Sequence, residues 1–121
     1  MALINAVIAW LMKKRIHQIE LFMRYPEEVQ NEWLRKLLST ARGTEIGKQY
    51  DFRSVGTHAQ FAERVPLHDY ETLKGYIDRL RKGEQNILWP SEIKWFAKSS
   101  GTTNDRSKFI PVSQEALEEC H

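Results

Sequence analysis

The chain has 121 residues, a length that fits one ordinary domain or a piece of a larger one. Hydrophobic residues make up 41% of the chain and charged residues 28%, which is the balance of a globular protein in water. A formal net charge of +2 is too even to indicate a nucleic-acid-binding protein. The single cysteine, Cys120, excludes an intramolecular disulfide and fits a reducing compartment.

The N-terminal segment is apolar over residues 1–12 and is followed directly by Lys13, Lys14 and Arg15. It is too short to cross a bilayer, which takes about 20 residues. A signal peptide would carry its positive charge before the apolar run. We therefore expect a packed helix, no integral membrane segment and a cytoplasmic location. An anchor that binds the membrane surface through residues 1–16 is the alternative.

Two helices are predicted in the first third of the chain. Apolar residues recur at every third or fourth position from Leu3 to Tyr25, which indicates a long amphipathic helix whose apolar stripe needs a partner. Pro26 suits the first turn of a second helix, and Gly43 is a plausible end for it. We expect these helices to form an antiparallel pair. Residues 44–56 show little periodicity and are predicted to be a connecting loop.

Two shorter helices are predicted next, from their capping residues. Thr57 and Gln60 have the spacing of a capping box, and Pro66 ends the helix that they open. Asp69 can cap the following helix, which Gly83 closes. The predicted inner face of that helix is Leu73, Tyr76, Ile77 and Leu80.

A β-hairpin is predicted near the end of the chain. Residues 93–98 alternate in polarity, which predicts a strand with Ile93, Trp95 and Ala97 on one face. Residues 109–112 indicate a second, short or edge strand because Pro111 lacks a backbone donor. Ser113 then caps a final helix. The tryptophans lie on apolar faces and are expected in the core: Trp10, Trp33, Trp89 and Trp95.

The expected fold class is therefore α+β, in which a mostly helical N-terminal part precedes the hairpin. The helical part comprises the antiparallel pair and two shorter helices. We expect residues 1–56 to hold the helical pair and the connecting loop, and residues 57–121 to hold the short helices and the hairpin. Because a two-stranded hairpin is marginal alone, further strands are expected from other sequence or from another chain.

The loop between the two predicted strands, residues 99–108, is the most informative segment for function. It reads Ser-Ser-Gly-Thr-Thr-Asn-Asp-Arg-Ser-Lys. Gly101 lets the backbone approach a ligand closely, and successive backbone N–H groups in a turn form a concavity that binds anions. Lys108 adds a mobile positive charge, with Lys94 and Lys98 nearby. Hydroxyl donors are supplied by Ser99, Ser100, Thr102 and Thr103. This composition favours polyphosphate binding, and the alternative is a polar loop without a ligand.

Two common phosphate-binding motifs are excluded at this loop. A Walker A loop needs a second glycine immediately before its lysine and leads into a helix, whereas here no glycine precedes Lys108 and Pro111 would stop a helix. A Rossmann fingerprint needs three glycines, and Gly101 is the only one in this loop. The predicted strand–loop–strand setting also differs from both motifs.

Ser-Ser-Gly-Thr-Thr followed by a lysine resembles the phosphate-loop signature of the adenylate-forming superfamily, which includes acyl-CoA synthetases and luciferases. That superfamily usually has glycine where Asn104 stands, and its lysine comes one residue earlier. The spacing here resembles the GH3 acyl-acid-amido synthetases, which join plant hormone acids to amino acids. Residues 61–66 and 69–79 resemble the GH3 segment before the loop. The resemblance covers about half the chain, residues 61–111.

The resemblance implies that the chain is the N-terminal fragment of an enzyme of several hundred residues, whose substrate pockets lie beyond His121. The enzyme would use ATP and Mg²⁺ to convert a carboxylic acid into an acyl-adenylate and pyrophosphate, and an amine, often of an amino acid, would then attack the acyl carbon. Lys108 is carried over as the catalytic residue. The residues carried over as cofactor-binding are Ser99, Ser100, Gly101, Thr102, Thr103 and Asn104. The fragment alone is expected to be inactive.

Other functions remain open from the sequence. A helical interaction module without catalysis would use the apolar stripe from Leu3 to Met23. The same stripe and the edges of the hairpin predict self-association of the fragment. No metal site is predicted, because the four histidines and Cys120 lack the spacing of metal ligands. Sequencing the gene past the codon for His121 would separate the ligase from the module.

Overall fold

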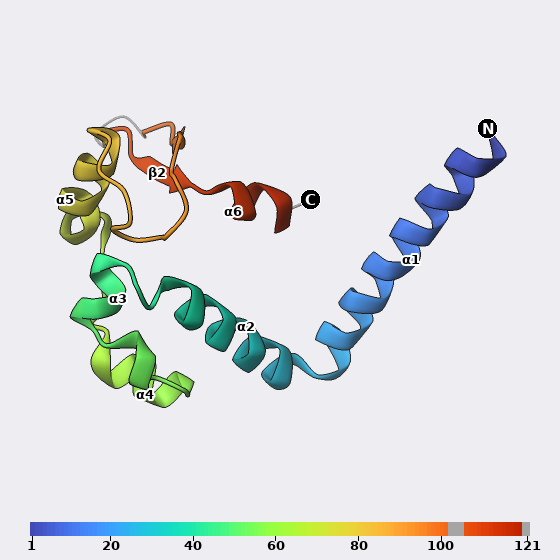
Figure 1. Ribbon diagram of the computed structural model, residues 1–121, viewed down its shortest axis with the longest axis horizontal. Coiled ribbons are helices and arrows are strands. Elements are labelled where there is room, and N and C mark those ends of the chain that lie inside the picture. Colours follow the sequence, from blue (N-terminus) through green and yellow to red (C-terminus); the bar gives the residue numbers. More distant parts are fainter. Residues whose placement is uncertain (102–105, 120–121) are drawn as a thin grey trace.

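The computed structural model describes residues 1–101 and 106–119, which form six α-helices, one 3₁₀ helix and two strands (Figure 1). This confirms the α+β class. The N-terminal helices are α1 (Ala2–Arg24), α2 (Pro26–Ala41) and α3 (Glu45–Gln49). They are followed by the 3₁₀ helix η1 (Phe52–Ser54), α4 (His58–Arg64) and α5 (Tyr70–Arg81). The C-terminal elements are β1 (Trp95–Lys98), β2 (Phe109–Val112) and α6 (Gln114–Glu119).

The first two helices form an open V instead of the expected antiparallel pair (Figure 1). Only Tyr25 separates α1 from α2, and Pro26 stands at the first turn of α2. Antiparallel helices need a loop of about two to five residues to reverse the chain, so one residue cannot fold α1 back along α2. As a result, α1 projects from the body and none of its residues is buried, whereas α2 buries Leu38 and Ala41 near its other end.

The segment predicted to be a loop, residues 44–56, is instead mostly helical. Thr44 caps α3, because its Oγ1 accepts the N–H of Gly47 at 3.0 Å and donates to the carbonyl of Ala41 at 2.7 Å. The Thr44 side chain is fully buried. The prediction was wrong because helices as short as α3 and η1 contain too few residues to show an apolar period.

The predicted caps of α4 and α5 are confirmed. The N–H of Gln60 donates to Thr57 Oγ1 at 3.2 Å, and Gln60 Oε1 accepts the N–H of Gly56 at 2.9 Å. The return bond of the capping box therefore reaches one residue further back than expected. Asp69 Oδ1 accepts the N–H of Thr72 at 2.8 Å, and this bond holds the pKa of Asp69 below its ordinary value.

The hydrophobic core lies where α5 meets the segment leading into β1. Leu80, Ile87 and Ile93 are buried together. Half-buried side chains packed against them are Tyr76, Leu88, Trp89 and Phe96. The predicted inner face of α5 is thus confirmed, with Ile77 and Leu80 buried and Leu73 and Tyr76 half-buried.

The predicted inward face of the first strand is wrong. Trp95 and Ala97 are exposed, whereas Phe96 packs against the core. The buried Ile93 lies before β1 begins at Trp95, so its burial does not determine which residues of the strand point toward the core. Trp10 and Trp33 are also exposed, on α1 and α2, against the expectation that they pack in the core.

The hairpin itself forms as predicted. Strands β1 and β2 pair antiparallel, with Trp95 opposite Val112 and Lys98 opposite Phe109. Ser113 then caps α6, because its Oγ accepts the N–H of Ala116 at 3.1 Å. The hairpin places residues 99 and 108 at the two ends of the connecting loop.

Candidate functional site

The hairpin closes the base of the predicted phosphate loop through two hydrogen bonds. The N–H of Ser99 donates to the carbonyl of Lys108 at 2.9 Å, and the N–H of Lys108 donates to Ser99 Oγ at 3.1 Å. The backbone donor of Ser99 is therefore engaged within the protein, while its hydroxyl proton can still be donated. The structure thus brings together the first and last residues of the predicted site.

A tyrosine from α5 supports the second half of this base. Tyr70 is the first residue of α5, next to the capping Asp69, and its hydroxyl accepts the N–H of Phe109 at 2.9 Å. The Lys108 Nζ lies 5.8 Å from the centroid of the Tyr70 ring. Because Phe109 directly follows Lys108, the hydrogen bond between the Phe109 N–H and Tyr70 holds the backbone next to Lys108 in place. The cap of α5 and the end of the loop are thereby coupled.

Positive charge gathers around Phe109. The guanidinium carbon of Arg81, at the end of α5, lies 3.8 Å from the centroid of the Phe109 ring. Lys98 Nζ lies 6.0 Å from the same ring. Both distances fall within the range of cation–π contacts. Arg81 and Lys98 therefore add positive charge next to Phe109, the residue that follows Lys108.

A hollow of ≈ 420 Å³ adjoins the loop. Its lining comes from α5 and from the segment that leads into β2: Tyr70, Glu71, Lys74, Asp78, Arg81, Arg106, Ser107 and Phe109. Lys74 Nζ lies 2.5 Å from Asp78 Oδ2, and this bond lowers the pKa of Asp78 and raises that of Lys74. Asp78 therefore stays ionised and offsets part of the positive charge on the α5 side of the hollow.

The remaining predicted site residues divide into two groups. Ser100 and Gly101 are exposed and lie two and three residues beyond the end of β1, where a ligand can reach their backbone. Thr102, Thr103 and Asn104 lie outside the described residues. Within residues 1–101 and 106–119, no group of three His, Cys, Asp or Glu side chains is arranged to hold a metal ion.

The sequence reasoning missed Tyr70 and Arg81. Tyr70 precedes Leu73 by three residues and Ile77 by seven, which places it on the apolar face of α5, but this spacing does not reveal its contact with Phe109. Arg81 follows Ile77 by four residues, so it lies about one turn further along the same side of α5. Their contacts with Phe109 join residues 28 to 39 positions apart in the chain, which local patterns do not report.

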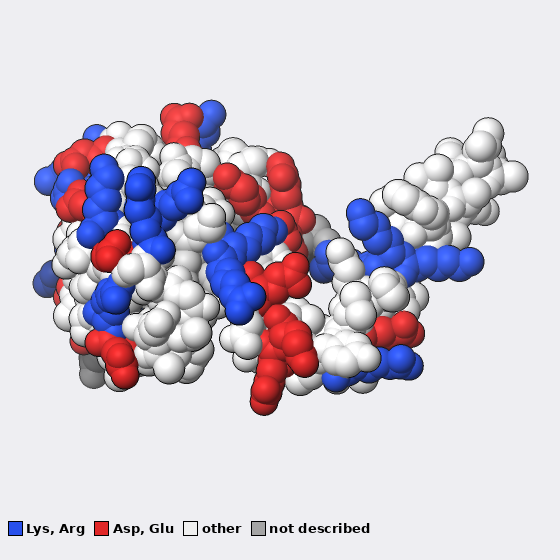
Figure 2. Space-filling model, turned by 60° about the horizontal axis from the view of Figure 1, so that its bottom comes forward, with Lys and Arg blue, Asp and Glu red and all other residues white. Residues whose placement is uncertain are grey.

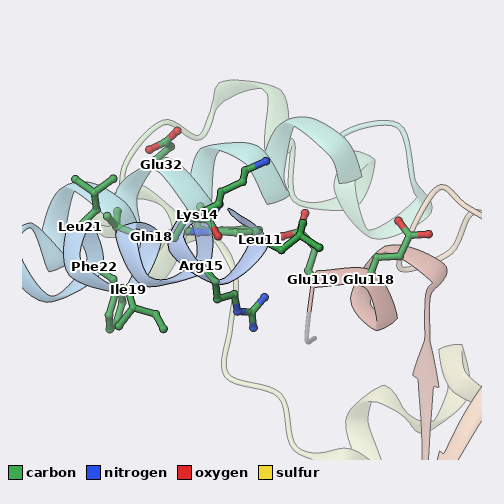
Figure 3. A pocket seen from close by; sticks show the side chains of 12 residues that line it. Leu11, Lys14, Arg15, Gln18, Ile19, Leu21, Phe22, Glu32, Glu118 and Glu119 are labelled. Atoms are coloured by element: carbon green, nitrogen blue, oxygen red, sulfur yellow. The ribbon is translucent and has the colours of Figure 1, made fainter. Parts of the chain in front are cut away.

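A second hollow, of ≈ 850 Å³, opens between α1, α2 and the end of α6 (Figure 3). Lys14 and Arg15 line it from α1, and Glu118 and Glu119 line it from α6. Glu119 also pairs with Lys36 of α2, with Nζ and Oε1 at 2.9 Å. None of the predicted site residues lines this hollow, so it does not belong to the base of the loop.

Known proteins resemble most of this chain. Residues 15–121 match the GH3 family N-terminal domain. The indole-3-acetic acid-amido synthetase GH3.2 of Arabidopsis thaliana is 34% identical over 106 residues, which cover 87% of this chain and 19% of that protein. The jasmonoyl–L-amino acid synthetase JAR4 of Nicotiana attenuata is 30% identical over 104 residues, 85% of this chain and 18% of that protein.

The similarity includes α2, α5 and the hairpin that closes the predicted loop, because the family match begins within α1 and continues to residue 121. The chain spans about a fifth of the length of the curated relatives it matches. The resemblance first noted at residues 61–111 therefore extends over most of the sequence. The chain belongs to the GH3 family.

Proposed function

We propose that this chain supplies the ATP-phosphate-binding loop of a ligase that joins a carboxylic acid to an amino acid through an acyl-adenylate. The relatives are named as acid-amido and amino acid synthetases, which supports the reaction class. The observation that carries the proposal for this chain is the closed base of the loop. There, hydrogen bonds between Ser99 and Lys108 hold the lysine opposite Ser99, which begins the Ser-Ser-Gly sequence.

The proposed role of the loop follows from where charge develops. When a carboxylate oxygen attacks the α-phosphorus of ATP, the bond to the β-phosphate bridging oxygen breaks and negative charge moves onto pyrophosphate. Donors fixed in advance stabilise such charge without reorganising. The exposed backbone at Ser100 and Gly101 and the ammonium of Lys108 are the groups assigned to this task, and Arg81 and Lys98 add positive potential.

We propose that Mg²⁺ enters the site bound to the phosphates of ATP. The described residues do not fit a metal site built by the protein, because they contain no cluster of three metal ligands. Magnesium at nucleotide sites is typically bound through substrate phosphates and only one or two carboxylates. We therefore assign no step to a metal ion held by this chain.

The second step of the proposed reaction, formation of the amide, needs groups that lie outside the hairpin and its neighbours on α5. An amine attacks the acyl carbon, an amide bond forms and AMP leaves. Among the described residues, the hairpin base offers the cations of Lys98 and Lys108 and the hydroxyl of Ser99, and we assign the acid and base for proton transfer from the amine to other parts of the enzyme. Since the chain spans about a fifth of its relatives' length, we assign the acyl and amine pockets to the rest of the enzyme.

Carboxylate-dependent exchange of labelled pyrophosphate into ATP tests this proposal. The protein made from the complete gene is expected to catalyse exchange with an acid substrate, and the 121-residue chain alone is expected to catalyse none. Exchange by the isolated chain would show that it holds a complete active site. Absence of exchange from the complete protein with a panel of aryl and alkyl acids would contradict the ligase assignment.

A further inference from the structure

The outer end of α1 is an exposed apolar surface that the loop and its chemistry do not use. Residues 2–12 include one polar side chain, Asn5, and no charged one. The largest of the exposed apolar side chains is Trp10, with 63% of its surface open to solvent. Figure 1 shows this end of the helix projecting from the body, and in Figure 2 it is a white, uncharged surface.

The apolar side chains of this segment gather on one side of the helix. Leu3, Val7 and Leu11 follow one another at intervals of four residues, and Ile4 and Ile8 lie beside them. Asn5, Ala6 and Ala9 lie on the opposite side. A helix with one strongly apolar side and a small opposite side can lie along a surface with the apolar side buried.

Positive charge borders this apolar surface. Lys13 and Lys14 are exposed and directly follow it, and Arg15 comes next. The first acidic residue of the chain is Glu20, so residues 1–19 carry three Lys or Arg side chains and no acidic one. Figure 2 shows Lys and Arg side chains at the base of the projecting helix end. Lys14 and Arg15 also line the hollow to which α6 contributes Glu118 and Glu119, whereas Lys13 does not line it. The segment thus combines an apolar surface with cations that can contact negative charge.

We propose that residues 2–12 bind the surface of an anionic membrane, with Lys13 and Lys14 at the level of the lipid headgroups. Interfacial helices combine an apolar face that enters the headgroup–acyl boundary with Lys or Arg side chains that contact anionic lipids. Tryptophan is enriched at this boundary, which suits Trp10. The proposal is independent of the ligase assignment.

The length of the segment favours binding along the surface. At 1.5 Å per residue, residues 2–12 extend over about 16 Å, roughly half of a hydrocarbon core of about 30 Å. Within the described part of the chain, no helix has the length and apolar character that crossing a bilayer requires.

A second copy of the chain fits this segment less well. Two copies of α1 packed side by side and parallel would place Lys13 and Lys14 beside the same residues of the other copy. Neither copy would supply an acidic partner from residues 1–19. The family match starts at residue 15, so the apolar segment also lies outside the part of the chain that is similar to the GH3 domain.

Co-sedimentation with vesicles tests the proposal, using phosphatidylcholine with and without phosphatidylglycerol. The chain is expected to bind the vesicles that contain phosphatidylglycerol. The double variant Lys13→Gln/Lys14→Gln should bind them roughly 25-fold more weakly, about fivefold for each charge removed. The control Lys48→Gln/Lys94→Gln removes two exposed cations elsewhere and should bind like the wild type.

A second variant tests the apolar face. Ile8→Gln/Leu11→Gln should abolish vesicle binding, while Leu67→Gln, at a fully exposed leucine outside α1, should leave it unchanged. Circular dichroism should show folded chains in all cases, because none of the α1 residues is buried. Equal binding by the Ile8/Leu11 variant and the wild type would overturn the proposal. So would self-association that depends on Ile8 and Leu11 without any vesicle binding.

Discussion

Thr44 shows how a single side chain joins two helices. It is fully buried, donates to the last residue of α2 and accepts from α3. Removing this hydroxyl leaves the buried N–H of Gly47 without its acceptor, whereas the Ala41 carbonyl still accepts the backbone N–H of Thr44 at 3.0 Å. Its importance was not predicted, because a threonine in a segment without periodicity carries no local signal of burial.

Replacing Thr44 with valine keeps the shape of the side chain and removes both hydrogen bonds. We expect Thr44→Val to lower the free energy of unfolding by about 1–3 kcal/mol, since the N–H of Gly47 loses its partner in a buried position. Urea unfolding followed by circular dichroism measures this. The matched control is Thr40→Val, whose exposed hydroxyl bonds the carbonyl of Lys36, and its effect should stay within about 0.5 kcal/mol. Equal effects of the two variants would contradict the role given to Thr44.

Arg79 connects three parts of the chain through charge. It forms two hydrogen bonds to Glu45, each of 2.8 Å, and one to Glu84 of 2.9 Å. These bonds hold the pKa of Glu45 below its ordinary value of 4.5 and raise the pKa of Arg79. Arg79 therefore ties α5 to α3 and to the turn that follows α5.

The lowered pKa of Glu45 predicts how stability depends on pH. Near pH 4.5 the unfolded chain binds more protons at Glu45 than the folded chain does, so the stabilisation is complete above that pH and is lost as the pH falls. We expect Arg79→Gln to make the loss of stability on acidification shallower, measured by urea unfolding at a series of pH values. Asp69 and Asp78 still contribute to the slope, because their pKa values are also lowered. Arg35→Gln, on the exposed surface of α2, should retain the wild-type slope, and an unchanged slope in Arg79→Gln would show that Glu45 is not held by this pair.

At the scale of elements, sequence patterns predicted the caps and strands that depend on neighbouring residues. They missed how one element lies against another. The caps at Thr57 and Asp69 and the second strand at residues 109–112 follow from residues within a few positions of one another. The open angle between α1 and α2 depends on the one-residue link at Tyr25. The strand face that packs inward depends on where β1 begins relative to Ile93. The spacing of apolar residues reveals neither the angle between the helices nor the inward face of the strand.

The joint between α2 and α3 requires a glycine. A Cβ at Gly47 would lie 2.1 Å from the carbonyl oxygen of Ala41, which belongs to the backbone and cannot turn aside. We expect Gly47→Ala to lower the free energy of unfolding by roughly 1–3 kcal/mol or more. Gly75→Ala is the matched control, because a Cβ there meets nothing within 4 Å and lies inside α5.

The control should change stability in the opposite direction. Alanine favours a helix interior over glycine by about 0.5–1 kcal/mol, so Gly75→Ala should raise the free energy of unfolding by that amount. Thermal and urea unfolding measure both variants. Destabilisation by both, or by neither, would contradict the close approach at Gly47.

The coupling between α5 and the loop can be tested at Tyr70. In Tyr70→Phe the N–H of Phe109 loses its acceptor, and amide hydrogen exchange at Phe109 should become roughly 5- to 10-fold faster. Tyr25→Phe, at an exposed tyrosine between α1 and α2, should leave this exchange rate unchanged. If exchange at Phe109 is the same in Tyr70→Phe and the wild type, α5 does not support the base of the loop.

For the whole molecule, the candidate site stays a prediction from residue type, and the structure adds the contacts that surround it. The run from Ser99 to Lys108 was identified by residue type, and the hairpin places its two ends in hydrogen-bonding contact. Tyr70 and Arg81 could not be found in this way, because α5 meets Phe109 only in the folded chain. The family match covers residues 15–121, so it includes the hairpin and α5 without singling out a site.

The central claim is that Lys108 stabilises charge on the phosphates of ATP, and pyrophosphate exchange by the complete enzyme carrying Lys108→Met tests it most directly. We expect the exchange rate at saturating acid and ATP to fall roughly 100-fold or more, because a donor fixed at developing charge acts mainly in the transition state. Lys48→Met, at an exposed lysine of α3, should exchange at the wild-type rate. An exchange rate for Lys108→Met equal to that of the wild type would contradict the account.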